Sequence, residues 1–515
     1  MKGKKALISV SNKEGAVLFA QELAMMGWEI ISTGGTARSL REDGIKVKDI
    51  SEVTGFPEML DGRVKTLHPK VHGGILGRRD LPLHDRQMKE QGIEAIDLVA
   101  VNLYPFPEVI ARKGTTLEEA IENIDIGGPA MIRAAAKNYR HVIVVVEPLM
   151  YSLVVEELRT SGDLSLSSRY QLAVRAFSHT AYYDSIISNY LRQGLDDQKD
   201  KFFPVTITLP FNKVQNLSPG ENSPQKAAFY REPLPGPATL AFGRSVLGKK
   251  PTYNDICDLH VAWELIKEFE QPAAVAVKNA SPYGAGLGEA LEEACRKALG
   301  NKRGNYFPAG AMAFNREVDE QTALMASKIL PKAIVAPSFT AEGLKIFSSW
   351  KNVYLREVPP GQFGGEHPGY CFKKISGGML LREAPPRVPA TDFWKCVTGR
   401  KPTEQEMGDL FLGLMVARHA KENAIVIAKR LQVLGLGSGQ IDQVGSVRIA
   451  LEGAGQNVGG AVMASDVCFK SPDGLEIAAA QGVTAVVQPG GAKIDDDIVS
   501  ICEKYNIAML FTGIH

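Results

Sequence analysis

The sequence ALISVSNKEG at residues 6–15 sets a mostly apolar run directly before a polar segment that is rich in helix-starting residues. Apolar side chains then recur at helical spacing from Val17 to Met26. A buried strand that turns into an amphipathic helix is the opening of a βαβ unit. This stretch therefore predicts an α/β fold whose strands run parallel and whose helices cover the sheet.

The same alternation continues on the C-terminal side of this stretch. Strand-like runs are expected at residues 28–32, 46–50, 97–104 and 141–146, and turns and helical segments separate them. Five strands joined by helices predict a parallel sheet with helices on both of its faces.

The first domain is expected to end after a long helix. This helix is predicted from Leu166 to about Arg192, and a stretch of poor periodicity follows it at residues 193–225. The stretch is rich in proline and contains the polar run DDQKD at residues 196–200, a composition typical of domain connections. We therefore predict a first domain over residues 1–197 and a second α/β domain over residues 198–515.

Composition and charge exclude several classes of protein. Lysine plus arginine (59) and aspartate plus glutamate (58) nearly balance over 515 residues, so no overall field attracts nucleic acid or an anionic membrane. The longest apolar runs fall far short of the roughly 20 residues that cross a bilayer. The N-terminus reads directly into a strand without a targeting segment, and no cysteine spacing is typical of a metal site. We expect a cytoplasmic protein without a bound metal.

Two loops of the first domain have the composition of phosphate-binding loops. Residues 11–13 follow the first predicted strand, and the glycine pair within residues 33–36 follows the second. Helix N-termini present unpaired N–H groups, and glycines let the backbone approach an anion. A second interpretation stays open, in which Ser11 and Thr36 only cap helices.

Further polar side chains concentrate at three later positions. Residues 63–68 carry two cations, a hydroxyl group and a histidine. Tyr104 follows an apolar strand and is expected at the carboxyl edge of the sheet, where open sheets bind ligands. Asp125 precedes a helix on which Arg133 and Lys137 stand one turn apart. From these residues alone, solvated loops and helix capping remain open interpretations.

Together these motifs resemble a known family over the whole chain. Its members are bifunctional purine-biosynthesis enzymes that join an IMP cyclohydrolase domain to an AICAR formyltransferase domain. The motifs of the first domain that carry the resemblance are SNK (11–13), STGGT (32–36), TGFPEML (54–60), RVKTLHP (63–69), NLYPF (102–106), DIGG (125–128) and RAAAKN (133–138).

The resemblance implies a methylglyoxal-synthase-like fold for the first domain and the closure of the ribotide FAICAR to inosine monophosphate, without a cofactor. It implies that Lys137 is the proton donor and acceptor, and it implies a homodimer. Lys65, Tyr104 and Asp125 are implied to orient the reacting groups. The residues implied to bind the substrate are Ser11, Asn12, Lys13, Thr33, Gly34, Gly35, Thr36, Arg63, Val64, Thr66, Asn102, Leu103, Ile126 and Gly127.

The second domain resembles the AICAR formyltransferase half, which implies a pair of cytidine-deaminase-like α/β subdomains. Most of the family's functional residues are replaced. Asn279 stands where the family has a proton-accepting histidine, and Gln443 stands where it has a substrate-binding arginine. Asparagine does not titrate near neutral pH as histidine does. We therefore expect a degenerate formyltransferase site, and its predicted residues are Lys278, Asn279, Asn423, Gln443 and Asp473.

Three functions remain in competition at this point. The leading one is an IMP cyclohydrolase whose formyltransferase half is degenerate, so that a separate AICAR formyltransferase supplies FAICAR. The first alternative is the full bifunctional enzyme with an altered folate site, which would use 10-formyltetrahydrofolate. The second alternative is a ribotide-binding sensor without turnover, although a pure binder does not need the proton-handling residues.

Overall fold

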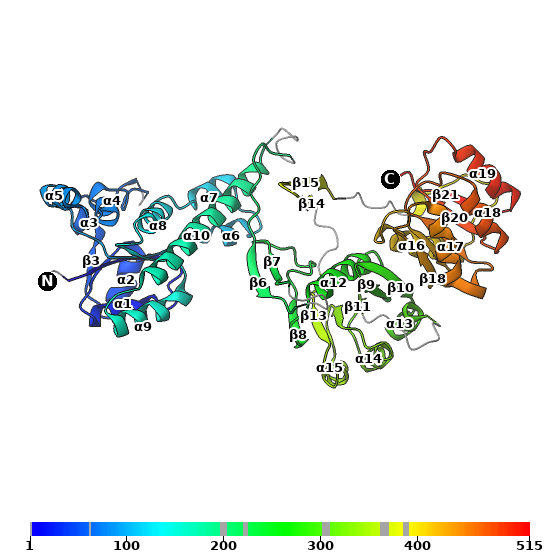
Figure 1. Cartoon of the computed structure of the whole chain (residues 1–515), viewed down its shortest axis with the longest axis horizontal. Coiled ribbons are helices and arrows are strands. Elements are labelled where there is room, and N and C mark those ends of the chain that lie inside the picture. Colours follow the sequence, from blue (N-terminus) through cyan, green and yellow to red (C-terminus); the bar gives the residue numbers. More distant parts are fainter. Residues whose placement is uncertain are drawn as a thin grey trace. The chain divides into compact units, whose positions relative to one another are not determined.

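The computed structural model describes residues 3–60, 63–195, 203–219, 225–300, 310–360, 370–384 and 391–514. The chain forms two compact units, Met1–Phe211 and Asn212–His515 (Figure 1). The boundary predicted between residues 197 and 198 lies outside the described residues. None of the helices in the described segments has the length and apolar character that a bilayer crossing needs.

The first unit contains a five-stranded sheet in which every pair of neighbouring strands is parallel. The strand order is β3-β2-β1-β4-β5. All five predicted strands are confirmed, with the bounds β1 Lys5–Val10, β2 Glu29–Ser32, β3 Val47–Asp49, β4 Leu98–Asn102 and β5 Ile143–Val145. The chain moves from β1 outward to β3 and then returns to the other side of β1. The loops that leave β1 and β4 therefore diverge, which creates a crevice at the carboxyl edge of the sheet.

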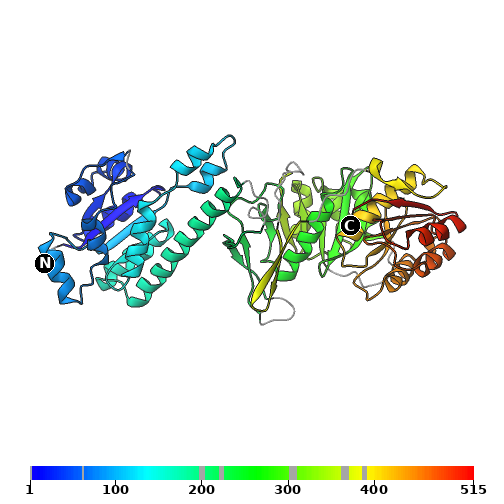
Figure 2. The ribbon, with the colours of Figure 1, turned by 90° about the horizontal axis from the view of Figure 1, so that it is seen from above.

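Helices cover this sheet, and three of them position the residues of interest. Helix α8 packs on β4 and β5, and it also contacts α4 and the long helix α10, which lies along it (Figures 1 and 2). On another side of the unit α1 packs against α9, where Phe19 stacks on Tyr151 at 4.4 Å between ring centroids. The helices are α1 Ala16–Met25, α2 Gly34–Glu42, α3 Ile50–Thr54, α4 Pro69–Leu76, α5 Pro82–Glu90, α6 Phe106–Ile110, α7 Leu117–Glu122, α8 Gly127–Lys137, α9 Tyr151–Ser161 and α10 Leu166–Arg192.

The second unit contains two six-stranded mixed sheets, with the orders β10-β9-β11-β12-β13-β8 and β16-β21-β20-β19-β17-β18. The strands are β8 Arg244–Gly248, β9 Ala273–Lys278, β10 Ser281–Leu287, β11 Ala311–Phe314, β12 Ala333–Ala336, β13 Tyr354–Glu357, β16 Lys395–Cys396, β17 Ile425–Ala428, β18 Val433–Gly437, β19 Val462–Ser465, β20 Ala485–Gln488 and β21 Ala508–Phe511. The helices are α12 Tyr253–Ile266, α13 Leu291–Leu299, α14 Glu320–Ala326, α15 Ala341–Ser348, α16 Glu404–Arg418, α17 Gln443–Ala454, α18 Asp473–Ala480 and α19 Asp495–Lys504. Two short ribbons, β6 Asn212–Asn216 with β7 Ala228–Arg231 and β14 Tyr370–Ile375 with β15 Gly378–Glu383, complete the described strands.

The two sheets are copies of one arrangement. The order of the first sheet read from β10 matches that of the second sheet read from β18. In these directions the second strands are β9 and β17, and each pairs antiparallel with both of its neighbours. Thr252 and Thr403, which stand 151 positions apart, both cap their helix with a reciprocal capping box. Asp258 and Asp409, again 151 positions apart, both accept hydrogen bonds from backbone N–H groups of the hairpin turn that follows. The unit therefore consists of two matching subdomains, which share one apolar core that includes residues of α12 and α16.

Candidate active site

One side chain connects the loops that leave β1 and β4. Asn102, the last residue of β4, accepts hydrogen bonds from the backbone N–H groups of Ser11 at 2.6 Å and of Asn12 at 2.9 Å. Its amide nitrogen donates to the carbonyl oxygen of Asn12 at 2.8 Å. The structure thus brings two of the predicted loops together, because Asn102 fixes the backbone of the loop that carries Lys13.

The loop after β2 forms the N-terminus of α2 at the same edge. Thr33, not Thr36, occupies the N-cap position, and its hydroxyl group pairs with Ser9 Oγ at 2.8 Å instead of capping the helix. Thr36 lies within α2 and joins this helix to β1. Its hydroxyl group accepts a hydrogen bond from the N–H of Val10 at 3.1 Å and donates one to the carbonyl oxygen of Val10 at 3.0 Å. Ser11 does not cap α1 either, because Gly15 holds that position. The capping interpretation of Ser11 and Thr36 is therefore wrong.

Two lysine ammonium groups lie over the first turn of α2. A Cβ atom built on Gly34 would lie 3.5 Å from Lys65 Nζ, and one built on Gly35 would lie 3.7 Å from Lys13 Nζ. Gly34 also has a positive φ of 42°, a conformation that side chains rarely adopt. The first N–H groups of a helix have no partner within the helix, and the helix dipole adds positive potential there. This arrangement can bind an anion such as a phosphate.

The segment of residues 63–68 connects this candidate anion site to α8. Lys65 forms an ion pair with Glu58 at 2.8 Å, and Arg63 forms one with Glu122. Thr66 is buried, and a Cβ atom on Gly127, the first residue of α8, would lie 2.7 Å from its hydroxyl oxygen. Glycine is therefore needed at position 127, so that Thr66 can approach the start of α8.

Asp125 lies at the same place, just before α8. Its carboxylate accepts a hydrogen bond from the N–H of Gly128 at 2.8 Å and another from the backbone N–H of Tyr104. Burial raises the pKa of Asp125 above its usual value, while these two N–H donors and the positive charge of Lys65 oppose the increase. A Cβ atom on Gly128 would lie only 2.5 Å from the Asp125 carboxylate and 2.7 Å from Leu103. The structure thus brings Lys65, Tyr104 and Asp125 together at the carboxyl edge.

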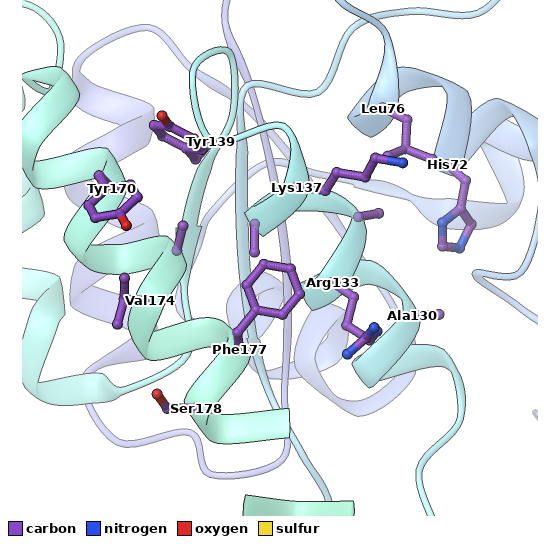
Figure 3. A pocket seen from close by; sticks show the side chains of 13 residues that line it. His72, Leu76, Ala130, Arg133, Lys137, Tyr139, Tyr170, Val174, Phe177 and Ser178 are labelled. Atoms are coloured by element: carbon purple, nitrogen blue, oxygen red, sulfur yellow. The ribbon is translucent and has the colours of Figure 1, made fainter. Parts of the chain in front are cut away.

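Lys137 lies at the opposite end of α8. The helix runs from Gly127 to Lys137, and a rise of about 1.5 Å per residue places its ends roughly 15 Å apart. Lys137 instead lines a hollow of about 800 Å³, together with His72 from α4 and Arg133 from α8 (Figure 3). Within one chain, the structure therefore does not bring Lys137 together with Asp125.

The hollow beside Lys137 combines cations with an apolar wall. Tyr170, Val174 and Phe177 of α10 line it, and the Arg133 guanidinium lies 5.5 Å from the centroid of the Phe177 ring. These three α10 side chains are 40–57% exposed. His72 was not singled out from the sequence; burial lowers its pKa, which favours the neutral ring. The predicted common face of Arg133 and Lys137 is confirmed, because both residues line this hollow.

The residues predicted for the formyltransferase site are divided between the two subdomains. Lys278 ends β9, and Asn279 follows it in a hairpin turn with φ of 53°. Asn423 donates to the carbonyl oxygen of Gln440 at 2.9 Å, and both residues line a second hollow of about 490 Å³. Gln443 is buried and donates to Ser465 Oγ at 2.9 Å, so its amide forms a hydrogen bond inside the subdomain.

Two aspartates of the subdomain that contains Gln443 differ in exposure. Asp473, the first residue of α18, is exposed. Asp466 accepts a hydrogen bond from the N–H of Ala424 at 2.7 Å, and burial raises its pKa to about 6. In the described segments, histidine, cysteine and acidic side chains do not gather in groups of three or more that could hold a metal ion.

Comparisons with known proteins place the chain in a family. The family described as AICARFT/IMPCHase bienzyme matches residues 135–453, and the MGS-like domain matches residues 15–130. The bifunctional purine biosynthesis protein PurH of Acetivibrio thermocellus is 47% identical over 510 residues, which cover 99% of this chain and 98% of the relative. PurH of Anoxybacillus flavithermus is 46% identical over 512 residues, which cover 99% of both chains.

A solved structure titled "Crystal structure of ForH" is 38% identical to this chain, covers 36% of it and 98% of the solved chain, and has a TM-score of 0.33. The two full-length relatives support the full bifunctional alternative better than they support a degenerate formyltransferase half. The first unit has the MGS-like fold that the sequence predicts. From the matches over both units we conclude that this chain belongs to the AICARFT/IMPCHase bienzyme family.

Proposed function

We propose that the first unit closes FAICAR to inosine monophosphate. The observation that carries this proposal is the meeting of Lys65, Tyr104 and Asp125 next to an anion site at the switch point of the sheet. In the reaction the carboxamide nitrogen attacks the formyl carbon and loses one proton. The formamido nitrogen loses a second proton, and the formyl oxygen leaves as water. The test is the formation of inosine monophosphate from FAICAR by the purified full chain.

The two parts of the site have separate tasks in this proposal. The N-terminus of α2, with Lys13 above it, binds the 5′-phosphate of the ribotide. Asp125 and Tyr104 hold the carboxamide and formyl groups in the geometry of attack, which contributes to the rate by orientation. Lys65 also stabilises the negative charge that develops on the formyl oxygen. The cyclisation needs no cofactor, and the cytoplasm stays the expected location.

Lys137 is the remaining group, and its position suggests how the site is completed. A separation of roughly 15 Å along α8 is too long for proton transfer between a lysine and a ribotide held at Asp125. We propose that two copies of the chain associate through the hollow around Lys137, so that Lys137 of one copy reaches the site of the other. The exposed apolar side chains of α10 beside Lys137 support such a contact, because association would bury them.

A ribotide-binding sensor without turnover has less support than an enzyme, because it leaves the Asp125 carboxyl group without a task. Binding a ribotide phosphate requires the cations and N–H groups at α2. It does not require the partly buried carboxyl group of Asp125, which is held by two backbone donors beside Lys65. This carboxyl group favours the enzyme.

Formyl transfer to AICAR from 10-formyltetrahydrofolate is the second candidate function. The two full-length relatives named as bifunctional favour it, and Lys278 stands at the end of β9 beside Asn279. The loss of the histidine at position 279 and of the arginine at position 443 argues for a slow reaction, because a correctly held general base contributes about 10²- to 10⁴-fold. If the activity is absent, a separate formyltransferase must supply FAICAR.

The expected result of a formyl-transfer assay follows from this second candidate. The full chain should convert AICAR with 10-formyltetrahydrofolate slowly, and Lys278→Ala should remove the activity. Lys429→Ala is the matched control, because Lys429 holds the corresponding position of the other subdomain, 151 residues later, where it donates to the carbonyl oxygen of Gly459. No turnover by the unmodified chain would instead support the degenerate site.

A further inference from the structure

A buried tyrosine of α10 holds the backbone around Asp125. The N–H of Asp125 donates to the hydroxyl oxygen of Tyr183 at 3.0 Å, and this hydroxyl group donates to the carbonyl oxygen of Asn123 at 3.4 Å. Tyr183 is 5% exposed, and burial raises its pKa to about 12, so its proton stays in place at neutral pH. One phenol therefore bridges both ends of the short link between α7 and α8.

The ring of the same tyrosine reaches the segment that carries Tyr104. It packs edge to face on Phe106, with 6.3 Å between the ring centroids. Phe106 is fully buried, and its N–H donates to the carbonyl oxygen of Tyr104 at 2.8 Å. Tyr190, two turns further along α10, also packs edge to face on Phe106, with 5.6 Å between the ring centroids. The long helix thus supports Tyr104 and Asp125 at once.

We propose that Tyr183 is a positioning residue of the cyclohydrolase site. It fixes the separation between Asp125 and Tyr104, through its hydroxyl group on the one side and its ring on the other. The proposal rests on the function proposed above for the first unit. The separation between Asp125 and Tyr104 matters because a displacement of about 1 Å in a reacting geometry costs on the order of 10²-fold in rate.

The test compares two substitutions that each remove one phenolic hydroxyl group from α10. Tyr183→Phe keeps the ring on Phe106 but leaves the Asp125 N–H without its partner. Tyr190→Phe is the matched control, since its ring touches the same phenylalanine. We expect Tyr183→Phe to lower kcat for FAICAR closure about 10- to 100-fold, with KM within about twofold. Tyr190→Phe should leave both parameters at their wild-type values.

A second measurement separates this proposal from the function on which it rests. Hydrogen–deuterium exchange of residues 123–128 should be faster in Tyr183→Phe than in wild type and unchanged in Tyr190→Phe. If the wild-type chain does not close FAICAR, the proposed function fails, and the exchange experiment still decides the role of Tyr183. Unchanged exchange in Tyr183→Phe, or a kcat within twofold of wild type, would overturn the proposal.

Discussion

Lys137→Ala should abolish the closure of FAICAR while the protein still binds a ribotide. A positioned acid or base contributes about 10²- to 10⁴-fold to a rate, so we expect a loss of at least 10²-fold in kcat. The phosphate-binding elements, which are Lys13 and the N-terminus of α2, lie at the other edge of the sheet of the same chain and are not altered by the substitution. Binding of inosine monophosphate, measured by calorimetry, should therefore persist.

Lys137→Arg separates the charge of this residue from its proton chemistry. Arginine keeps the positive charge, but it does not give up its proton in proteins. We expect Lys137→Arg to be as inactive as Lys137→Ala. Wild-type turnover in either variant would show that Lys137 is not the proton donor and acceptor.

Two inactive variants should restore activity to each other if the site is shared between copies. Lys137→Ala removes the proton-transfer group, and Asp125→Asn removes the carboxylate that lies at the other end of α8. When equal amounts are dissociated and reassociated, half of the dimers contain both variants, and each of these has one complete site. We expect about a quarter of the wild-type activity from this symmetric arrangement.

The controls for this experiment are the two variants, each dissociated and reassociated alone. They should stay inactive, because every site in them lacks the same group. No recovery in the mixture, from variants that are folded and dimeric, would contradict the proposal that Lys137 serves the site of a second copy.

The sequence predicts the first unit well because its signals are local. Each strand is a short apolar run such as residues 98–102, followed by a turn, and this alternation requires a parallel sheet. The switch point then places Asn102 and Tyr104 opposite the loop of residues 11–13. The meeting of these loops could therefore be predicted from the order of elements.

The position of Lys137 could not be predicted in this way. Its motif lies only ten positions after Gly127, and proximity in sequence suggests proximity to Asp125. Because these ten positions form a helix, they extend roughly 15 Å along its axis, and Lys137 therefore lies far from Asp125. The hydrogen bond between Tyr183 and Asp125 was equally hidden, because it spans 58 positions and depends on how α10 packs.

The second unit shows a different limit of sequence analysis. Its duplication has a period of 151 residues, and only scattered positions such as Asp258 and Asp409 coincide. A few side chains with the same structural task leave almost no periodic signal. The resemblance implies a replacement at Gln443, but only the structure shows that the amide of Gln443 is buried against Ser465.

The central claim is tested most directly by giving the purified chain of residues 1–515 FAICAR alone, without AICAR, folate or another enzyme. Ring closure can be followed by ultraviolet absorbance, and the product can be identified by mass as FAICAR minus one water. We predict stoichiometric formation of inosine monophosphate, at a rate that depends on enzyme concentration. FAICAR that stays unchanged in the presence of folded, ribotide-binding protein would contradict the account.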